Sequence, residues 1–148
     1  KGDLNTADNF LGDFPAVVVR PNQYGTLPFD IPHRFLAYGE VKAPHGITLM
    51  PAFEIRSGFP FSVVDERLDF VGARNSSRFP TVLELDATIL QSFKVPYFDK
   101  KVRAGVIIFN ITNHFNPRDV QSNLGSPQFG QFFNSLGTSV RGKFEMDF

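Results

Sequence analysis

The stretch Val-Arg-Gly-Lys-Phe-Glu-Met-Asp-Phe, residues 140–148, alternates without a break between uncharged and charged side chains. Every even position is uncharged, and each odd position between them carries Arg, Lys, Glu or Asp. Successive side chains of a β-strand point to opposite sides, so the stretch predicts a strand with one uncharged face and one charged face. Its length is about what a tilted strand needs to cross a bilayer.

The same period of two recurs in four earlier stretches, which we expect to be strands. They run from about Arg34 to Lys42, Ile47 to Arg56, Leu83 to Val95 and Lys101 to Asn113. In the third stretch, Gln91 interrupts the uncharged row and Leu90 falls in the polar row. The fourth stretch is apolar on both faces at residues 107–111, so its facing stays open there, and a bulge or a locally packed lumen would explain it. Helical periodicity is almost absent, and the chain is predicted to be all-β.

The connections between the expected strands alternate in length. Residues 43–46 and 96–100 form short connections, whereas residues 57–82 and 114–138 form long polar ones. Long irregular loops are uncommon in compact soluble domains, but transmembrane β-barrels combine short periplasmic turns with long external loops. We therefore predict about five strands of an antiparallel transmembrane β-barrel. Five strands do not close such a barrel, which needs about eight or more, so residues 1–148 are expected to be the C-terminal part of one incomplete domain.

The composition argues against several functional classes. Fifteen Lys and Arg balance fifteen Asp and Glu, whereas a nucleic-acid partner usually requires a basic face. The absence of cysteine excludes disulfides, thiolate metal sites and cysteine nucleophiles. The three histidines are far apart and lack metal-ligand spacing. No nucleophile-elbow or phosphate-binding motif occurs, so we expect no enzymatic activity, catalytic residue, cofactor or metal.

Several short motifs follow one another in a distinctive order. They are Asp30-Ile31-Pro32-His33-Arg34-Phe35, Arg56-Ser57-Gly58-Phe59-Pro60-Phe61, Arg78-Phe79-Pro80, Leu85-Asp86, Phe109-Asn110-Ile111-Thr112-Asn113-His114-Phe115-Asn116-Pro117 and Phe129-Gly130. With a final strand that contains Arg141 and ends in Phe148, this order resembles the C-terminal barrel of TonB-dependent receptors. It is most similar to the Oar-like group, whose members carry a carboxypeptidase-regulatory-like domain. The resemblance covers nearly the whole chain from about Asp30.

This resemblance implies a barrel of about 22 strands with a plugged lumen, of which these are the last five. It implies a location in the bacterial outer membrane and the import of a nutrient. The implied partners are outer-membrane lipid, the barrel-assembly machinery, the remainder of the barrel with its plug, and the TonB complex, which an N-terminal part would contact. No nucleic acid is expected, and the transported substrate is not identified.

Two sets of functional residues are predicted. Polar residues expected to face the lumen and the substrate path are Glu54, Arg56, Glu84, Asp86, Arg141 and Lys143. Residues expected to form an assembly signal, because a terminal Phe on an alternating strand resembles the one in outer-membrane barrels, are Phe144, Met146 and Phe148. Five phenylalanines of the long loops are expected either to stack on a ligand such as a sugar, or to form an aromatic girdle or pack loop against loop: Phe59, Phe61, Phe129, Phe132 and Phe133.

Two alternatives of other classes remain. A non-transporting surface protein or adhesin would use the same strands as a barrel anchor. A soluble β-sandwich binding module would also alternate, because one face of each sheet covers a core. Charged residues of both signs on the polar faces, and uncharged faces as long as a bilayer is thick, favour the membrane barrel.

Overall fold

The structure is a computed structural model, and it describes residue 22, residues 24–95 and residues 100–146. Within these ranges the chain forms strands, turns and one 3-10 turn, and every ladder between named strands is antiparallel. The prediction of an all-β chain with antiparallel sheets is therefore confirmed. No helix among the described residues is long and apolar enough to span a membrane.

The chain divides into two compact units. The first comprises Lys1–His33, Ser57–Thr81 and Pro117–Asn134, and the second comprises Arg34–Arg56, Val82–Asn116 and Ser135–Phe148.

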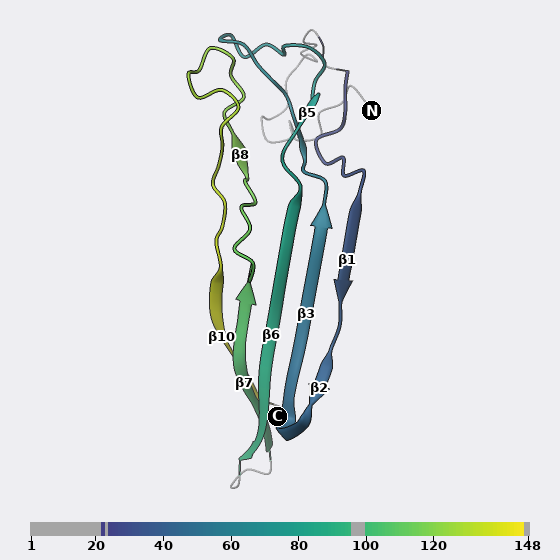
Figure 1. Cartoon of the computed structure of the whole chain (residues 1–148), viewed down its shortest axis with the longest axis vertical. Helices are drawn as coiled ribbons and strands as arrows, with labels where there is room; N and C mark the ends of the chain where they lie inside the picture. The colour runs from purple at the N-terminus through teal and green to yellow at the C-terminus, as the bar shows by residue number, and fades with distance from the viewer. Residues whose placement is uncertain (1–21, 23, 96–99, 147–148) are drawn as a thin grey trace, which may run out of the picture. The chain divides into compact units, whose positions relative to one another are not determined.

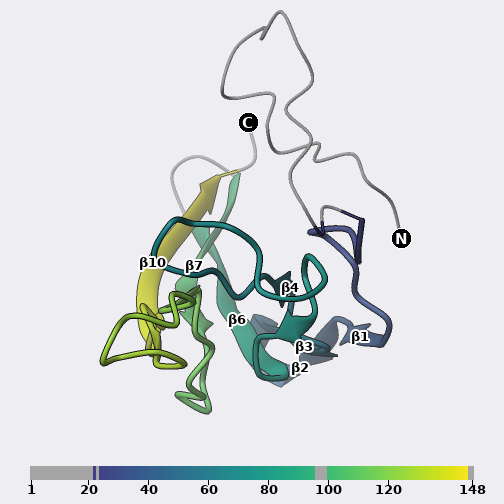
Figure 2. The ribbon, with the colours of Figure 1, turned by 90° about the horizontal axis from the view of Figure 1, so that it is seen from above.

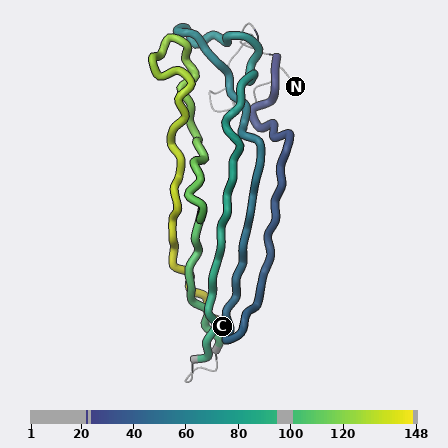
Figure 3. Tube along the Cα trace, viewed as in Figure 1, coloured from purple at the N-terminus to yellow at the C-terminus, as the bar shows by residue number. Residues whose placement is uncertain are grey.

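The second unit is built on one sheet with the strand order β1-β3-β6-β7-β10, and β2 also pairs with β3. Neighbours in the sheet follow one another along the unit's chain, so the strands lie side by side as a meander (Figures 1 and 3). Figure 2, which looks along the strands, shows them following an arc. The described strands form an open sheet with β1 and β10 at its edges. The strands are β1 (Arg34–Tyr38), β2 (Val41–Ala43), β3 (Ile47–Arg56), β6 (Val82–Val95), β7 (Lys100–Phe109) and β10 (Ser139–Met146).

The first expected strand is divided into β1 and β2, and Pro51 of β3 is the reason. Gly39 lies opposite Pro51 and donates its N–H to the Pro51 carbonyl at 3.2 Å. Proline has no N–H to return the second hydrogen bond of the pair. The register is the same on both sides of the gap, because Tyr38 faces Ala52 and Val41 faces Leu49. The two pieces therefore act as one strand with a local break.

The fourth strand ends earlier than predicted, at Phe109 instead of Asn113. Asn110 and Asn113 have φ angles of 49° and 51°, a left-handed conformation that asparagine tolerates but a strand does not continue through. The β6–β7 register runs unbroken from Ala87↔Ile108 to Val95↔Lys100, so β7 contains no bulge. The registers of β7 with β6 and β10 also assign the facing of residues 107–109, whereas Asn110 and Ile111 lie beyond the strand.

Of the two short connections, the one at residues 43–46 is a tight turn. Pro44–Gly46 forms a 3-10 turn in which His45 has a φ of 64°. Most of the second connection, residues 96–99, lies outside the described residues.

The first unit contains short ladders that the sequence did not predict. In the loop between β3 and β6, β4 (Pro60–Phe61) pairs with β5 (Ser77–Arg78). In the loop between β7 and β10, β8 (Asp119–Val120) pairs with β9 (Phe132–Phe133). These two-residue strands are too short to leave an alternating pattern in the sequence.

Candidate functional site

The register of the sheet sorts its side chains onto two faces, because residues directly opposite each other in a ladder point to the same side. One set of connected partners, which we call the uncharged face, contains one charged residue, Lys100, which opposes Val95 where the β6–β7 ladder ends. Its other members on the described strands are Phe35, Ala37, Val41, Ala43, Ile47, Leu49, Pro51, Phe53, Ile55, Leu83, Leu85, Ala87, Ile89, Gln91, Phe93, Val95, Val102, Ala104, Val106, Ile108, Val140, Gly142, Phe144 and Met146. The opposite side, the charged face, carries all the ionic residues of these strands whose side chains the structure describes.

On the edge strand β10, two apolar residues of the uncharged face are more exposed than two charged residues of the opposite face. On β10, the apolar residues Val140 and Phe144 are 62% and 65% exposed. The charged side chains of Lys143 and Glu145, between and beyond them, are only 33% and 29% exposed. Soluble proteins rarely expose a contiguous apolar surface of this extent. The exposed part of the uncharged face is therefore a candidate contact surface.

The two exceptions to the alternation in β6 have local causes. Leu90 lies on the charged face, where it is 1% exposed and opposes Gly105. A Cβ on Gly105 would lie 1.8 Å from the Ile89 carbonyl oxygen, so only glycine fits beside this part of β6. Gln91 lies near the end of the uncharged face and donates its side-chain N–H to the main-chain carbonyl of His45 in the β2–β3 turn.

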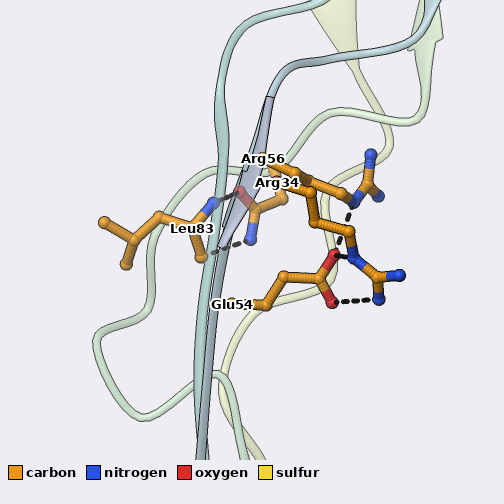
Figure 4. A network of polar contacts seen from close by, with 5 residues as sticks. Arg34, Glu54, Arg56 and Leu83 are labelled. Carbon is orange, nitrogen blue, oxygen red and sulfur yellow. Dashed lines mark hydrogen bonds and ion pairs between the residues drawn. The ribbon is translucent and has the colours of Figure 1, made fainter. Parts of the chain in front are cut away.

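All six predicted lumen residues lie on the charged face, but they belong to separate groups. The first group is built around Glu54 (Figure 4). Arg34 donates to both Glu54 carboxylate oxygens, from Nε at 2.9 Å and from Nη2 at 3.3 Å. Arg56 Nε lies 3.2 Å from Glu54 Oε1. Arg34 opposes Arg56 in the β1–β3 ladder, so the carboxylate neutralises two cations that would otherwise repel each other.

Glu84 lies directly opposite Glu54 in the β3–β6 ladder. Two carboxylates at opposed positions repel each other, and the two arginines bound to Glu54 reduce that repulsion. The two carboxylates and the two arginines thus form a charge-balanced group at the end of the sheet.

The second group lies between β7 and β10. Glu145 receives Lys143 Nζ on Oε1 at 2.9 Å and Arg103 Nη2 on Oε2 at 2.9 Å. Farther along β10, the Arg141 guanidinium carbon lies 5.2 Å from the centroid of the Phe109 ring. A cation over an aromatic face is attracted to it, which accounts for a phenylalanine on the charged face.

The third group is a hydrogen-bonded turn that we call the asparagine cap (residues 110–116). Asp86 Oδ1 accepts the Asn110 N–H at 2.8 Å. The Asn110 side chain, in a residue that is 7% exposed, donates to the carbonyls of His114 and Leu136 at 3.0 Å each. Its Oδ1 accepts the His114 N–H at 3.0 Å. The Asp86 carboxylate thus stabilises this cap through its hydrogen bond to the Asn110 N–H.

Asn116 completes the cap by taking the place of a strand residue opposite β6. β6 begins at Val82, but its ladder with β7 begins only at Ala87. Leu83 therefore has no strand partner on the side of β7. The Asn116 side chain accepts the Leu83 N–H at 3.0 Å and donates to the Leu83 carbonyl at 2.8 Å. Its own main-chain N–H donates to Ser135 Oγ at 2.9 Å. A single carboxamide therefore satisfies both polar groups of a strand residue.

Asn110 and Asn116 belong to one of the motifs that carry the family resemblance, but the sequence pattern predicted no role for them. Their bonds reach Leu83, Ser135 and Leu136, which are far away in the sequence. The only signal was the density of asparagine, three residues in seven, which is typical of turns held by side-chain hydrogen bonds.

The loop phenylalanines divide into packed and exposed rings. Phe61 and Phe132 form a cluster with Phe79, and Phe59 contacts Phe29 edge-on at 6.4 Å between centroids. Phe129 and Phe133 are 43% and 44% exposed. Loop-to-loop packing, one of the expected roles, therefore holds for Phe61 and Phe132.

Two of the three residues of the predicted assembly signal, Phe144 and Met146, lie on the uncharged face of β10. Phe148 lies outside the described residues. In the described ranges, no three His, Asp or Glu side chains gather in a way that could hold a metal ion.

In comparisons with known proteins, no protein-family model, no curated protein and no solved structure matches the chain.

Proposed function

We propose that the sheet of the second unit is part of the wall of a transmembrane β-barrel in the bacterial outer membrane. The uncharged face contacts lipid, and the charged face lines a water-filled lumen. The observation that carries this proposal is the sorting of residues by the register across all the long strands: one face carries uncharged residues up to Lys100 at its end, and the other carries the ionic ones. On β10, Val140 and Phe144 are also more exposed than Lys143 and Glu145, which supports placing the charged face on the inner side of the arc.

The dimensions of the uncharged face support the same proposal. Phe35 opposes Ile55, which opposes Leu83, and Phe93 follows ten residues later in β6. Ten strand residues span about 33 Å, which corresponds to about 25 Å along the membrane normal at a strand tilt of about 40°. Aromatic rings lie toward both ends of this span and aliphatic side chains between them, as in the apolar band and aromatic girdles of outer-membrane barrels.

The order of the sequence motifs leads us to propose further that this barrel belongs to a TonB-dependent receptor that imports a nutrient. Its partners would be outer-membrane lipid, the barrel-assembly machinery, the rest of the barrel with its plug, and the TonB complex. On the charged face, ion pairs engage Glu54, Arg56 and Lys143, and the asparagine cap engages Asp86. Glu84 and the exposed Arg141 are then the predicted residues best placed to contact a polar solute.

A pair of substitutions at neighbouring positions of β6 tests the facing. Ile89 is on the uncharged face and 39% exposed, so arginine there would be harmless in water. Near the middle of a bilayer it should cost about 2–4 kcal/mol. Thr88→Arg, one residue away on the charged face, should be mild. The measurement is the folded fraction of the full-length protein in the outer membrane, scored by heat-modifiable gel mobility. Equal folding of Ile89→Arg and Thr88→Arg would remove the lipid-facing assignment.

A further inference from the structure

Two long loops belong to the first unit. Loop A (residues 57–81) connects β3 to β6, and loop B (residues 117–134) lies between the asparagine cap and the segment that enters β10. Each loop has hydrogen bonds of its own: the Val71 N–H donates to the Val63 carbonyl in loop A, and the Gln121 N–H donates to the Gln131 carbonyl in loop B, both at 2.9 Å.

Aromatic rings join the two loops. Phe61 and Phe79 of loop A contact each other with ring centroids 5.3 Å apart. Phe132 of loop B lies 6.1 Å from Phe61 and 5.5 Å from Phe79. These separations and the tilted or edge-on orientations are those in which aromatic pairs attract each other. One ring of loop B therefore completes a cluster supplied by loop A.

Main-chain hydrogen bonds join the loops at a second place. The Val64 N–H donates to the Ser122 carbonyl at 3.0 Å, and the Leu124 N–H donates to the Val64 carbonyl at 2.9 Å. Val64 thus forms a parallel bridge with Asn123. Both polar groups of one loop A residue are satisfied by loop B, so separating the loops would break two hydrogen bonds as well as the ring cluster.

We infer that loops A and B form one cooperative gate, which opens and closes as a single body. A gating role rests on the proposed function, because it requires that a solute pass these loops to reach the lumen. The coupling itself does not depend on that assumption. Ring contacts and main-chain hydrogen bonds join the two loops. Opening of one loop breaks these contacts, so local opening spreads from one loop to the other. A solute that displaces loop B must then displace loop A.

Amide hydrogen exchange of the full-length protein, read on peptides that cover residues 62–72 and 119–131, tests the coupling. Phe132→Ala removes two ring contacts and should speed exchange in both loops, including at Val71 and Gln121, by a common factor of about 5- to 150-fold. The matched control is Phe133→Ala. Phe133 is next to Phe132 in sequence and is 44% exposed, so its substitution should leave exchange in loop A unchanged.

Faster exchange confined to loop B in Phe132→Ala would show that the loops open separately and would overturn the inference. Exchange in the β3–β6 ladder reports whether the variant keeps the sheet. If Phe132→Ala does not fold, Phe132→Leu keeps an apolar side chain without the ring, and the same comparison of the two loops applies. Failure of the coupling leaves the Ile89→Arg and Thr88→Arg comparison unaffected, so the gate and the membrane facing are tested separately.

Discussion

Removing the Asn116 side chain should weaken the sheet although this residue belongs to no strand. Asn116 is 9% exposed and satisfies both main-chain polar groups of Leu83. In Asn116→Ala, the Leu83 N–H and carbonyl both lose their partner. An unsatisfied buried polar group costs about 1–3 kcal/mol. Because Leu83 is half-buried, water compensates in part, and we expect a loss of about 2–3 kcal/mol in the free energy of unfolding.

Asn116→Asp should be at least as destabilising near neutral pH. A carboxylate still accepts the Leu83 N–H, but its second oxygen takes the place of the nitrogen that lies 2.8 Å from the Leu83 carbonyl oxygen. A donor is thereby replaced by a charged acceptor that repels the carbonyl. The two variants together separate the loss of hydrogen bonds from the loss of shape, because Asp has nearly the size of Asn.

The measurement is urea unfolding of the full-length protein in lipid vesicles, followed by far-ultraviolet circular dichroism. Gln131→Ala is the control, because Gln131 is exposed and its side chain makes no hydrogen bond within the described part of the chain. Its effect should stay within about 0.5 kcal/mol. If Asn116→Ala were as mild as Gln131→Ala, the carboxamide would not act as a substitute strand residue.

Three further predictions concern the sheet and its connections. Gly105→Val should abolish correct pairing of β6 with β7, because a Cβ would lie 1.8 Å from the Ile89 carbonyl oxygen. The control Gly142→Val should fold, because no atom lies within 4 Å of the added Cβ, and equal folded yields of the two variants would contradict this prediction. Cysteines placed at Ser76 and Gln128 should react with an impermeant thiol reagent in intact cells and one at His45 should not, and labelling at His45 alone would invert the topology. A double-mutant cycle with Arg141→Gln and Phe109→Leu should give a coupling free energy of about 0.5–1 kcal/mol, and a coupling of zero would mean that the ring and the guanidinium do not interact.

Alternation in the sequence was sufficient to predict the long strands and their two faces. Ile47–Arg56 forms β3 with the predicted bounds, and the charged residues of β10 share one face as expected. This succeeded because each side chain's face depends only on its position in a period of two. The facing of residues 107–109 needed the register, since Ile107, Ile108 and Phe109 are all apolar and give no alternation.

Features that depend on contacts distant in sequence were not predicted. The break between β1 and β2 comes from Pro51, which belongs to the neighbouring strand. The asparagine cap depends on the Asn116–Leu83 pair, whose members are 33 positions apart. The density of asparagine at residues 110–116 indicates a turn, but no local pattern identifies Leu83 as the partner of Asn116 or Pro51 as the cause of the break. The predicted substrate-path residues share one face of the sheet, but their division into an Arg34–Glu54–Arg56 group, a Glu145 group and the cap follows from cross-strand neighbours alone.

The most direct test of the central claim is a nitroxide scan along β10 of the full-length protein in lipid bilayers. Single labels at residues 140–146 are compared for collision with oxygen, which concentrates in lipid, and with a water-soluble nickel complex. Labels replacing Val140, Gly142, Phe144 and Met146 should be accessible to oxygen, and labels replacing Arg141, Lys143 and Glu145 should be accessible to nickel. Access to nickel at every position, or the opposite alternation, would contradict the account of a lipid-facing uncharged surface.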